Sequence, residues 1–284
     1  MKLFYTSDLH GSEAHYGRLM AAARDVRPDV IILGGDMLPD DSALDPSSMG
    51  VGQPKYVSQQ FRKHIQTLRE QSGCRHVLVI FGNHDWSSSV KAMSELADDG
   101  LVSVLSLDKP VKIDGIFFLG YSCSPPTPWF VKDFERLDRP GDLPPLLGGA
   151  RWDARFSRAS PHSATVLFKN SPTIADELAA LKPPGDPWVL VAHAPPHETN
   201  LDRTYGHIPW GSKSIRAAIE RHQPMLSIHG HVHESPTVTG SIQDTLGKTV
   251  SVNPGQVRSK LSYAVIELDP KRGSVVGVQH GLQT

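Results

Sequence analysis

The sequence contains little cysteine, no long hydrophobic run and almost no net charge. Only two of its 284 residues are cysteine, Cys74 and Cys123, and they lie far apart in unlike surroundings. A disulfide between them stays open as an alternative, but a reduced pair in a cytoplasmic protein is the simpler interpretation. We therefore take the cytoplasm as the expected location.

Membrane and nucleic-acid partners receive no support from the sequence. No apolar stretch approaches the roughly 20 residues that a membrane-spanning helix requires. The chain turns polar by Asp8, too early for the apolar core of a secretory signal, so we expect no such signal. The formal net charge of −1 provides no global attraction for nucleic acid or an acidic membrane.

Alternation of strands and helices predicts an α/β fold. Short apolar segments followed at once by polar residues are predicted as buried strands at 2–6, 29–33, 76–81, 188–192 and 225–228. Segments with helical spacing of apolar residues lie at 12–26, 57–69, 87–97, 174–181 and 212–222. This order indicates a sheet with helical crossover connections.

Two further regions depart from this alternation. Beyond residue 233, the segments 237–242, 249–253, 263–268 and 274–279 predict short strands. We expect them to form an added β-rich layer beside the first sheet, within one domain that spans residues 1–284. The segment at about 121–160 is long and rich in Pro and Gly, and it is either a lid or insertion over the site or an irregular excursion. Its aromatic residues suit stacking on a substrate, but packing onto the domain explains them equally well. Its arginines suit a phosphate, but a solvated face is the better interpretation for them. The residues are Trp129, Phe130, Trp152, Phe156, Arg151, Arg155 and Arg158.

Polar clusters follow each of the five strands, and their contents point to a metal site. Ligands of open α/β sheets bind at the carboxyl ends of the strands. The clusters contain, in order, Asp8-x-His10, Asp36, Asn83-His84-Asp85, His193 and His231-x-His233. Carboxylate, imidazole and amide oxygen together form a suitable ligand set for two divalent metals.

Spacing and glycines agree with that interpretation. Members of the Asp-x-His and His-x-His pairs lie on the same side of an extended segment and can point into one site. Glycines precede Asp36, Asn83 and His231, where a side chain would crowd the metals. Each piece alone is weak, because a single histidine is more often a satisfied core residue than a ligand. Together, each at its own strand end, the pieces are hard to assign to chance.

These motifs resemble those of the calcineurin-like metallophosphoesterase superfamily. Its pattern runs D-x-H, G-D, G-N-H-[DE], a lone His, then G-H-x-H, and this chain matches it from Asp8 to His233. Asn253-Pro-Gly255 is similar to a segment that often follows in smaller members. The resemblance implies a four-layer α/β/β/α sandwich of two mixed sheets flanked by helices.

The resemblance also implies a role for each motif residue. One metal would be held by Asp8, His10, Asp36 and His233, and the other by Asp36, Asn83, His193 and His231. A hydroxide that bridges the metals would attack phosphorus in line. His84 would face the phosphate as the catalytic residue, and Asp85 receives no role. The metals are two divalent ions among Mn, Fe, Zn and Co.

We predict a metal-dependent phosphoester hydrolase that acts on a small or accessible phosphoester. The ligands do not separate the two ester classes, and we favour phosphodiesterase over phosphomonoesterase. A serine/threonine protein phosphatase is disfavoured because no arginine follows Gly35-Asp36 in the segment 37–41. A nuclease stays open without support from the charge. The alternative from another class is a non-catalytic metal-binding scaffold or interaction protein on the same fold.

Overall fold

The first of two six-stranded sheets is built from the N-terminal strands and from the last two strands of the chain. The computed structural model describes residues 1–40 and 49–284. Six strands form this sheet in the order β14 (Ser274–Gln283), β13 (Leu261–Asp269), β1 (Lys2–Thr6), β2 (Val30–Gly34), β3 (His76–Ile80) and β4 (Ser103–Val104). Strands β1 to β4 run parallel, whereas β13 is antiparallel to β1 and to β14. The sheet is therefore mixed.

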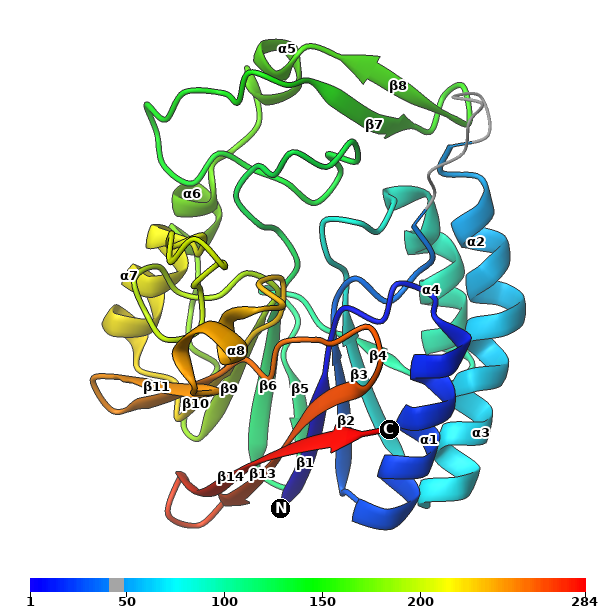
Figure 1. The fold of residues 1–284 in the computed structure, drawn as a ribbon, viewed down its shortest axis with the longest axis vertical. Coiled ribbons are helices and arrows are strands. Elements are labelled where there is room, and N and C mark those ends of the chain that lie inside the picture. Colours follow the sequence, from blue (N-terminus) through cyan, green and yellow to red (C-terminus); the bar gives the residue numbers. More distant parts are fainter. Residues whose placement is uncertain (41–48) are drawn as a thin grey trace.

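The second sheet is also mixed and stacks on the first (Figure 1). Its six strands follow the order β11 (Gln243–Leu246), β12 (Thr249–Val252), β10 (Leu226–Ile228), β9 (Trp188–Ala192), β6 (Ile116–Tyr121) and β5 (Val111–Ile113). The four central strands are parallel and the two edge strands are antiparallel to their neighbours. Ile32, Phe118 and Val191 pack together between the sheets.

Helices cover the outer face of each sheet. On the first sheet lie α1 (Glu13–Val26), α3 (Arg62–Ser72) and α4 (Val90–Asp98), and on the second α6 (Ile174–Ala179) and α7 (Lys213–His222). Alternate residues of a strand face opposite sides, so Phe4 packs under helices such as α1 while its neighbours Leu3 and Tyr5 enter the intersheet core. The predicted α/β/β/α sandwich is thus confirmed.

Local sequence signals explain where the main helices start and stop. Ser12 caps α1 by accepting a hydrogen bond from the backbone N–H of His15, and Ser212 caps α7 in the same way. Both helices end at a residue in the left-handed conformation that directly precedes a proline. The helix predicted at 57–69 is longer than expected, because α2 (Gly52–Tyr56) and a π-helical turn, η2 (Val57–Phe61), lead directly into α3.

The C-terminal prediction requires two corrections. The segment 237–242 does not form a strand: α8 (Ser235–Thr239) occupies it, with Pro236 in its first turn and Gly240 as its left-handed C-cap. These stop and start signals outweigh the β-branched residues between them. The remaining C-terminal strands do not form one added layer, since β12 joins the second sheet and β13 and β14 join the first.

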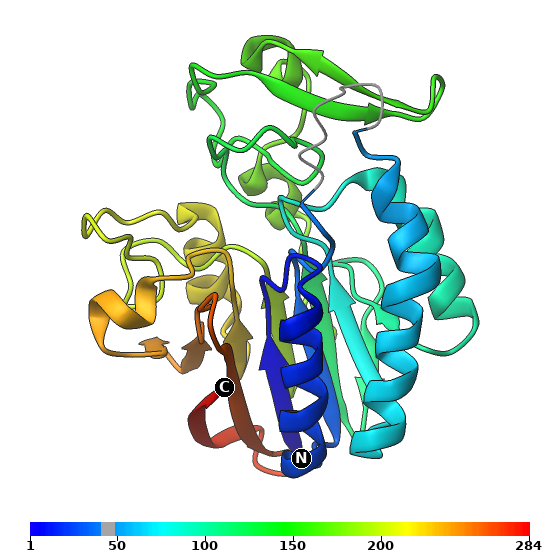
Figure 2. The same ribbon diagram turned by 45° about the vertical axis from the view of Figure 1, so that its right-hand side comes forward.

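The segment 121–160 contains more regular structure than the sequence suggests. An antiparallel hairpin of β7 (Gly149–Asp153) and β8 (Arg158–His162) is followed by α5 (Ala164–Phe168). Figures 1 and 2 both show this unit at the top of the molecule, beyond the ends of the two sheets. Trp152 of the hairpin packs with Trp86 and Val131, and Arg151 donates hydrogen bonds to Lys132 and Ser171. These two side chains therefore pack the unit against neighbouring segments of the chain.

Both cysteines are free and buried in the structure, as the interpretation of a reduced pair requires. Cys74 packs under the helices of the first sheet, and Cys123 packs on the outer face of the second. Among the described residues, no helix has the length and apolar character that crossing a membrane demands.

We expect the intersheet packing to dominate stability. Ile32→Ala removes a fully buried side chain and should lower the free energy of unfolding by about 2–5 kcal/mol, measured by urea denaturation. Ile208→Ala is the matched control, because that side chain is 60% exposed and its loss should change the value by less than about 0.5 kcal/mol. Equal effects from the two substitutions would contradict the assignment of Ile32 to the core.

Candidate metal centre

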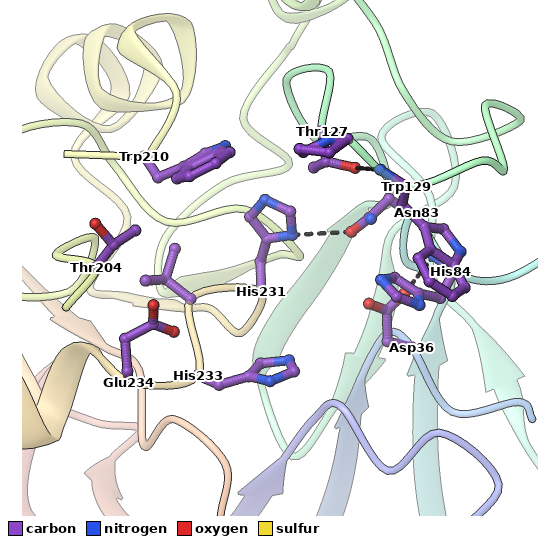
Figure 3. A pocket seen from close by; sticks show the side chains of 12 residues that line it. Asp36, Asn83, His84, Thr127, Trp129, Thr204, Trp210, His231, His233 and Glu234 are labelled. Atoms are coloured by element: carbon purple, nitrogen blue, oxygen red, sulfur yellow. Dashed lines mark hydrogen bonds between the residues drawn. The ribbon is translucent and has the colours of Figure 1, made fainter. Parts of the chain in front are cut away.

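All eight predicted site residues meet at the carboxyl ends of five parallel strands. Strands β1, β2 and β3 supply the residues from the first sheet, and β9 and β10 supply those from the second. Figure 3 shows several of them pointing toward one another. The set consists of Asp8, His10, Asp36, Asn83, His84, His193, His231 and His233.

In the part of the chain that the structure describes, three groups of carboxylate and imidazole atoms lie close enough to share a cation. In each group the potential ligand atoms are all within 4.8 Å of one another. The groups are Asp8–His10–His233, Asp8–Asp36–His193 and His10–Asp36–His84. Asp8, His10 and Asp36 each belong to two groups, so the three groups form one continuous cluster.

Asn83 connects two of the three histidines that come from the second sheet. Its amide oxygen lies 3.1 Å from Nε2 of His193 and 2.8 Å from Nδ1 of His231. His193 also approaches Oδ2 of Asp36, at 3.4 Å. His233 Nε2 lies 3.1 Å from Oδ1 of Asp8. Imidazole nitrogens thus face oxygen atoms throughout, which is the donor set that divalent transition metals prefer.

The backbone is strained at half of the set. Asp8, His10, Asp36 and His231 adopt positive φ angles of 59°, 46°, 51° and 66°. Residues with a side chain seldom occupy this left-handed region, and such strain concentrates at functional sites. The conformation turns each side chain into the cluster at the point where its strand ends.

Glycines leave the room that the sequence predicts for them. A β-carbon at Gly82 would collide with the Asp36 carboxylate, and one at Gly230 would collide with the side chains of Ser7 and Asp8. These close approaches explain why glycine stands directly before Asn83 and His231.

The cluster holds buried negative charge that requires positive charge beside it. Burial opposes ionisation of Asp8 and Asp36, but nearby His233 and His193 outweigh that effect and lower both pKa values. The reverse holds for the histidines. Burial opposes the charge on His10 and His193, yet Asp40 and Asp36 raise the pKa of each to about 9. These raised pKa values favour protonated rings at His10 and His193, which place positive charge beside the two carboxylates.

Asp85 has a role that the sequence does not reveal. Its buried carboxylate accepts hydrogen bonds from the backbone N–H groups of Asp36 (3.1 Å), Leu38 (3.1 Å) and Gly82 (2.9 Å). It therefore ties the turn after β2 to the turn after β3. Burial, and then the charge of Asp36, raise the pKa of Asp85 to about 7.

Asn253 performs the same kind of task for the Gly-His-Val-His turn. Its amide group donates to the carbonyl oxygens of Leu201, Gly230 and Val232 at 2.9 to 3.2 Å, and its oxygen accepts from the N–H of Gly255 at 2.9 Å. The sequence shows the Asn-Pro-Gly motif, but it does not show which backbone groups Asn253 binds.

Three contributors to the site escape the sequence motifs. Oδ1 of Asp40 contacts Nδ1 of both His10 (3.0 Å) and His84 (2.7 Å). The indole of Trp129 stacks on His84, with ring centroids 4.2 Å apart. Gln53 donates to the carbonyl oxygen of His84 at 3.0 Å. The aromatic content of the segment 121–160 is the one signal that could have found any of them, through Trp129.

His229, beside the last motif, is not part of the cluster. Its ring nitrogens lie 3.0 Å from the carbonyl oxygens of Ala192 and Ala194 and 2.9 Å from the Ser227 hydroxyl. Burial lowers its pKa to about 4. His229 is therefore a hydrogen-bonded histidine at the end of β10.

Two cavities open beside the cluster. One, of about 360 Å³, is lined by Asp36, Asn83 and His231. The other, of about 560 Å³, is lined by Asp8 and His10. Both are also lined by His84, Trp129 and His233, so the stacked pair of His84 and Trp129 stands between them.

Comparison with known proteins identifies the family. The model of the calcineurin-like phosphoesterase family matches residues 1–235. No curated protein matches the sequence. One solved structure aligns over 100% of this chain and 99% of its own, with a TM-score of 0.64 and 17% identity. TT1561 of Thermus thermophilus aligns over 99% and 98%, with a TM-score of 0.56 and 16% identity. A putative 5′-nucleotidase from Staphylococcus aureus, in complex with alpha-ketoglutarate, aligns over 99% of this chain and 53% of its own, with a TM-score of 0.50 and 14% identity. At these identities the structural likeness establishes the fold alone.

We expect the metal-free protein to lose stability as the pH rises from about 6.5 to about 9. The folded pKa values of His10 and His193 are raised to about 9, above the value near 6.5 of an unfolded chain. The stability that protonated His10 and His193 contribute is therefore fully present below the unfolded pKa near 6.5. It is lost as the pH rises through the folded pKa of about 9. The melting temperature in a chelator should fall by roughly 5–10 °C over this range, and Mn²⁺ should remove the loss. A melting temperature that stays level in the chelator would contradict the charge arrangement.

Proposed function

The chain belongs to the calcineurin-like phosphoesterase family, whose members hydrolyse phosphoester bonds with divalent metals, and from that premise we propose that it is a phosphodiesterase with a two-metal centre. Hydrolysis of a phosphoester bond follows from the family itself. The preference for diesters, the number of metals and the role of each residue are the proposal.

The cluster suits two ions because neighbouring groups of ligand atoms share members. We propose that one ion is held by Asp8, His10, Asp36 and His233, and the other by Asp36, Asn83, His193 and His231. Asp36 is common to both sets, and it also belongs to two of the close groups of atoms. The mixture of ligands fits Mn, Fe, Zn or Co. When bound, such ions lower the pKa of a coordinated water and neutralise charge on the phosphoryl oxygens.

His84 is the proposed catalytic residue. Asp40 engages Nδ1 of its ring at 2.7 Å, and Trp129 packs on its face, so Nε2 is the atom left to meet a substrate. A proton on Nε2 would stabilise charge on the phosphoryl group or pass to the departing oxygen. Asp40 and Trp129 act as positioning residues, because together they define the orientation of the ring.

The observation that carries the preference for diesters is the pair of cavities on either side of His84. A phosphodiester has two substituents, and each cavity offers space for one of them next to the cluster. Charge agrees with this assignment. Arg258 is the one Lys or Arg among the described residues that line the two cavities. A monoester dianion would favour a stronger cationic clamp than a diester monoanion does.

The lid predicted at about 121–160 receives a narrower proposal. We propose that the part of this segment that acts as a lid over the site is the loop 124–136, which places Trp129 at the cluster. The hairpin of β7 and β8 is not part of the proposed lid. A single domain over residues 1–284 remains our proposal for the domain organisation.

We expect the metal-reconstituted protein to prefer bis-p-nitrophenyl phosphate over p-nitrophenyl phosphate. The metal-stripped protein loaded with Mn²⁺ should hydrolyse the diester with the higher kcat/KM, by about 10-fold or more, since each ring finds its own cavity. Release of p-nitrophenol reports both reactions. Asn83→Ala should abolish the activity, whereas Asn200→Ala, a change outside the cluster, should keep it.

Other outcomes would point elsewhere. Faster hydrolysis of the monoester would overturn the diesterase assignment and leave a phosphomonoesterase. A protein that binds little metal, or that binds metal without hydrolysing any phosphoester, would favour the non-catalytic scaffold.

We expect His84→Ala and Asp36→Ala to separate catalysis from metal binding. His84→Ala should retain both metals and lose roughly 10²–10⁴-fold in kcat, the usual contribution of a positioned acid or base. Asp36→Ala should lose metal as well as activity, because the shared ligand is gone. Metal content by elemental analysis distinguishes the two variants. His76→Ala, at the exposed start of β3, is the control, and wild-type turnover in His84→Ala would disprove the assigned role.

A further inference from the structure

The smaller cavity has a wall whose chemistry differs from that of the metal cluster. Beyond Asp36, Asn83 and the histidines, it is lined by two indoles, Trp129 and Trp210, and by Thr204 and Glu234 (Figure 3). Its volume of about 360 Å³ lies in the usual range for small-molecule sites. The composition of this wall indicates which substituent the cavity accepts.

One indole is fixed by a buried ion pair inside the loop 124–136. Nζ of Lys132 lies 2.7 Å from Oε2 of Glu135, and both side chains are fully buried. Lys132 also donates to the carbonyl oxygen of Thr127 at 2.8 Å, and the Thr127 hydroxyl donates to Glu135 at 2.6 Å. Thr127 in turn accepts from the N–H of Trp129 at 3.1 Å. Trp129 is therefore held in place before any ligand arrives.

The second indole is held by a separate turn at 203–210. The N–H of Trp210 donates to the carbonyl oxygen of Asp202 at 2.9 Å, and that of Thr204 donates to Ile208 at 3.1 Å. The turn is anchored to the start of α8, just after the last motif, because the N–H of Arg203 donates to the Ser235 hydroxyl at 3.0 Å. The side chain of Trp210 is nevertheless 38% exposed. An indole on an anchored turn that stays partly open toward a cavity is suited to contact a ligand.

The charge of the cavity selects against anions away from the metals. None of its described lining residues is a Lys or Arg. Glu234 is half-buried, and among the described residues no side chain bonds to its carboxylate. A carboxylate only accepts hydrogen bonds, so a ligand group near it must donate them. A phosphate or carboxylate on this substituent would be repelled.

We propose that this cavity is a specificity pocket for a flat, uncharged ring that carries an N–H donor, supplied by one ester substituent of the substrate. The ring lies against the indoles of Trp129 and Trp210, and its donor reaches Glu234. The inference rests on the proposed function, because it assigns one arm of the diester to this cavity. It also makes Trp210 and Glu234 specificity-determining residues that take no part in the reaction.

Phosphonates that cannot be hydrolysed at their P–C bond test the pocket by binding alone. Calorimetric titration of the Mn²⁺-loaded protein compares methylphosphonate, benzylphosphonate and 4-aminobenzylphosphonate. Benzylphosphonate should bind at least ~10-fold more tightly than methylphosphonate, through apolar burial and stacking. The amino group should add a further ~3–10-fold through its hydrogen bond to Glu234.

Each residue has its own expected signature. Trp210→Ala should reduce the preference for benzyl over methyl to within ~3-fold and leave the affinity for methylphosphonate unchanged. Glu234→Gln should remove the gain from the amino group and keep the gain from the ring. Tyr205→Ala is the matched control, because this aromatic residue lies on the same turn, is 73% exposed and is not part of the cavity wall. It should bind all three ligands like the wild type.

The outcomes separate this inference from the proposed function. Equal affinity for the methyl and benzyl compounds, or a ring preference that survives Trp210→Ala, overturns the pocket. If the Glu234→Gln variant still binds 4-aminobenzylphosphonate more tightly than benzylphosphonate, the assigned contact between the N–H donor and Glu234 is wrong. None of these measurements needs turnover, so failure to hydrolyse any ester would overturn the proposed function while the selectivity for the ring could still be measured.

Discussion

Two buried carboxylates, Asp8 and Asp36, impose the constraint on which the rest of the site depends. They lie together where the ends of the two sheets meet, and each raises the cost of ionising the other. Burial adds to that cost, so they are stable as anions only with positive charge close by. Histidines from both sheets surround them for this reason. In the absence of metal, the raised pKa values of His10 and His193 favour rings that carry this positive charge. Under the proposed function, they would become neutral ligands when a metal ion supplies the charge instead.

The cluster in turn explains the strain and the buried polar groups around it. Left-handed backbone at Asp8, Asp36 and His231 costs energy and persists only where the surroundings hold it. Side chains outside the cluster stabilise these left-handed turns. Asp85 joins the turns after β2 and β3, and Asn253 braces the turn after β10. Each satisfies several backbone groups with one buried side chain, so the strained turns are rigid before a ligand arrives.

The site is closed by residues that lie outside the sequence motifs. Asp40 and Trp129 meet at His84 and fix its ring between two cavities. Trp129 comes from a loop stabilised by its own buried ion pair of Lys132 and Glu135, and Trp210 comes from a turn tied to the residues that follow the last metal motif. The substrate space is thus built by connections between strands, whereas the chemical groups are supplied at the strand ends themselves.

Periodicity was enough to predict the elements nearest the site. Five strands and the helices that begin after Ser12 and Ser212 could be placed from the sequence, because apolar runs and helical spacing of apolar residues are visible over short stretches. Strand β6, in the interior of the second sheet, is not among the predicted strands although its run of apolar residues is continuous. The sequence predicts a strand near α8 because Thr and Val favour strands. That prediction gives too little weight to Pro236 and Gly240, which mark the start and the end of a helix.

The sequence by itself determined the residue types of the cluster, their order along the chain and the family resemblance. These properties are local, since each motif sits at the end of its own strand and needs no knowledge of its neighbours. Only the tertiary structure decided what surrounds them: that Asp40 contacts His10 and His84, that Asp85 is an anchor for backbone groups, and that Trp129 and Trp210 line one cavity. Such contacts join residues on separate loops, and loop paths depend on packing against the whole fold. No spacing in the chain encodes them.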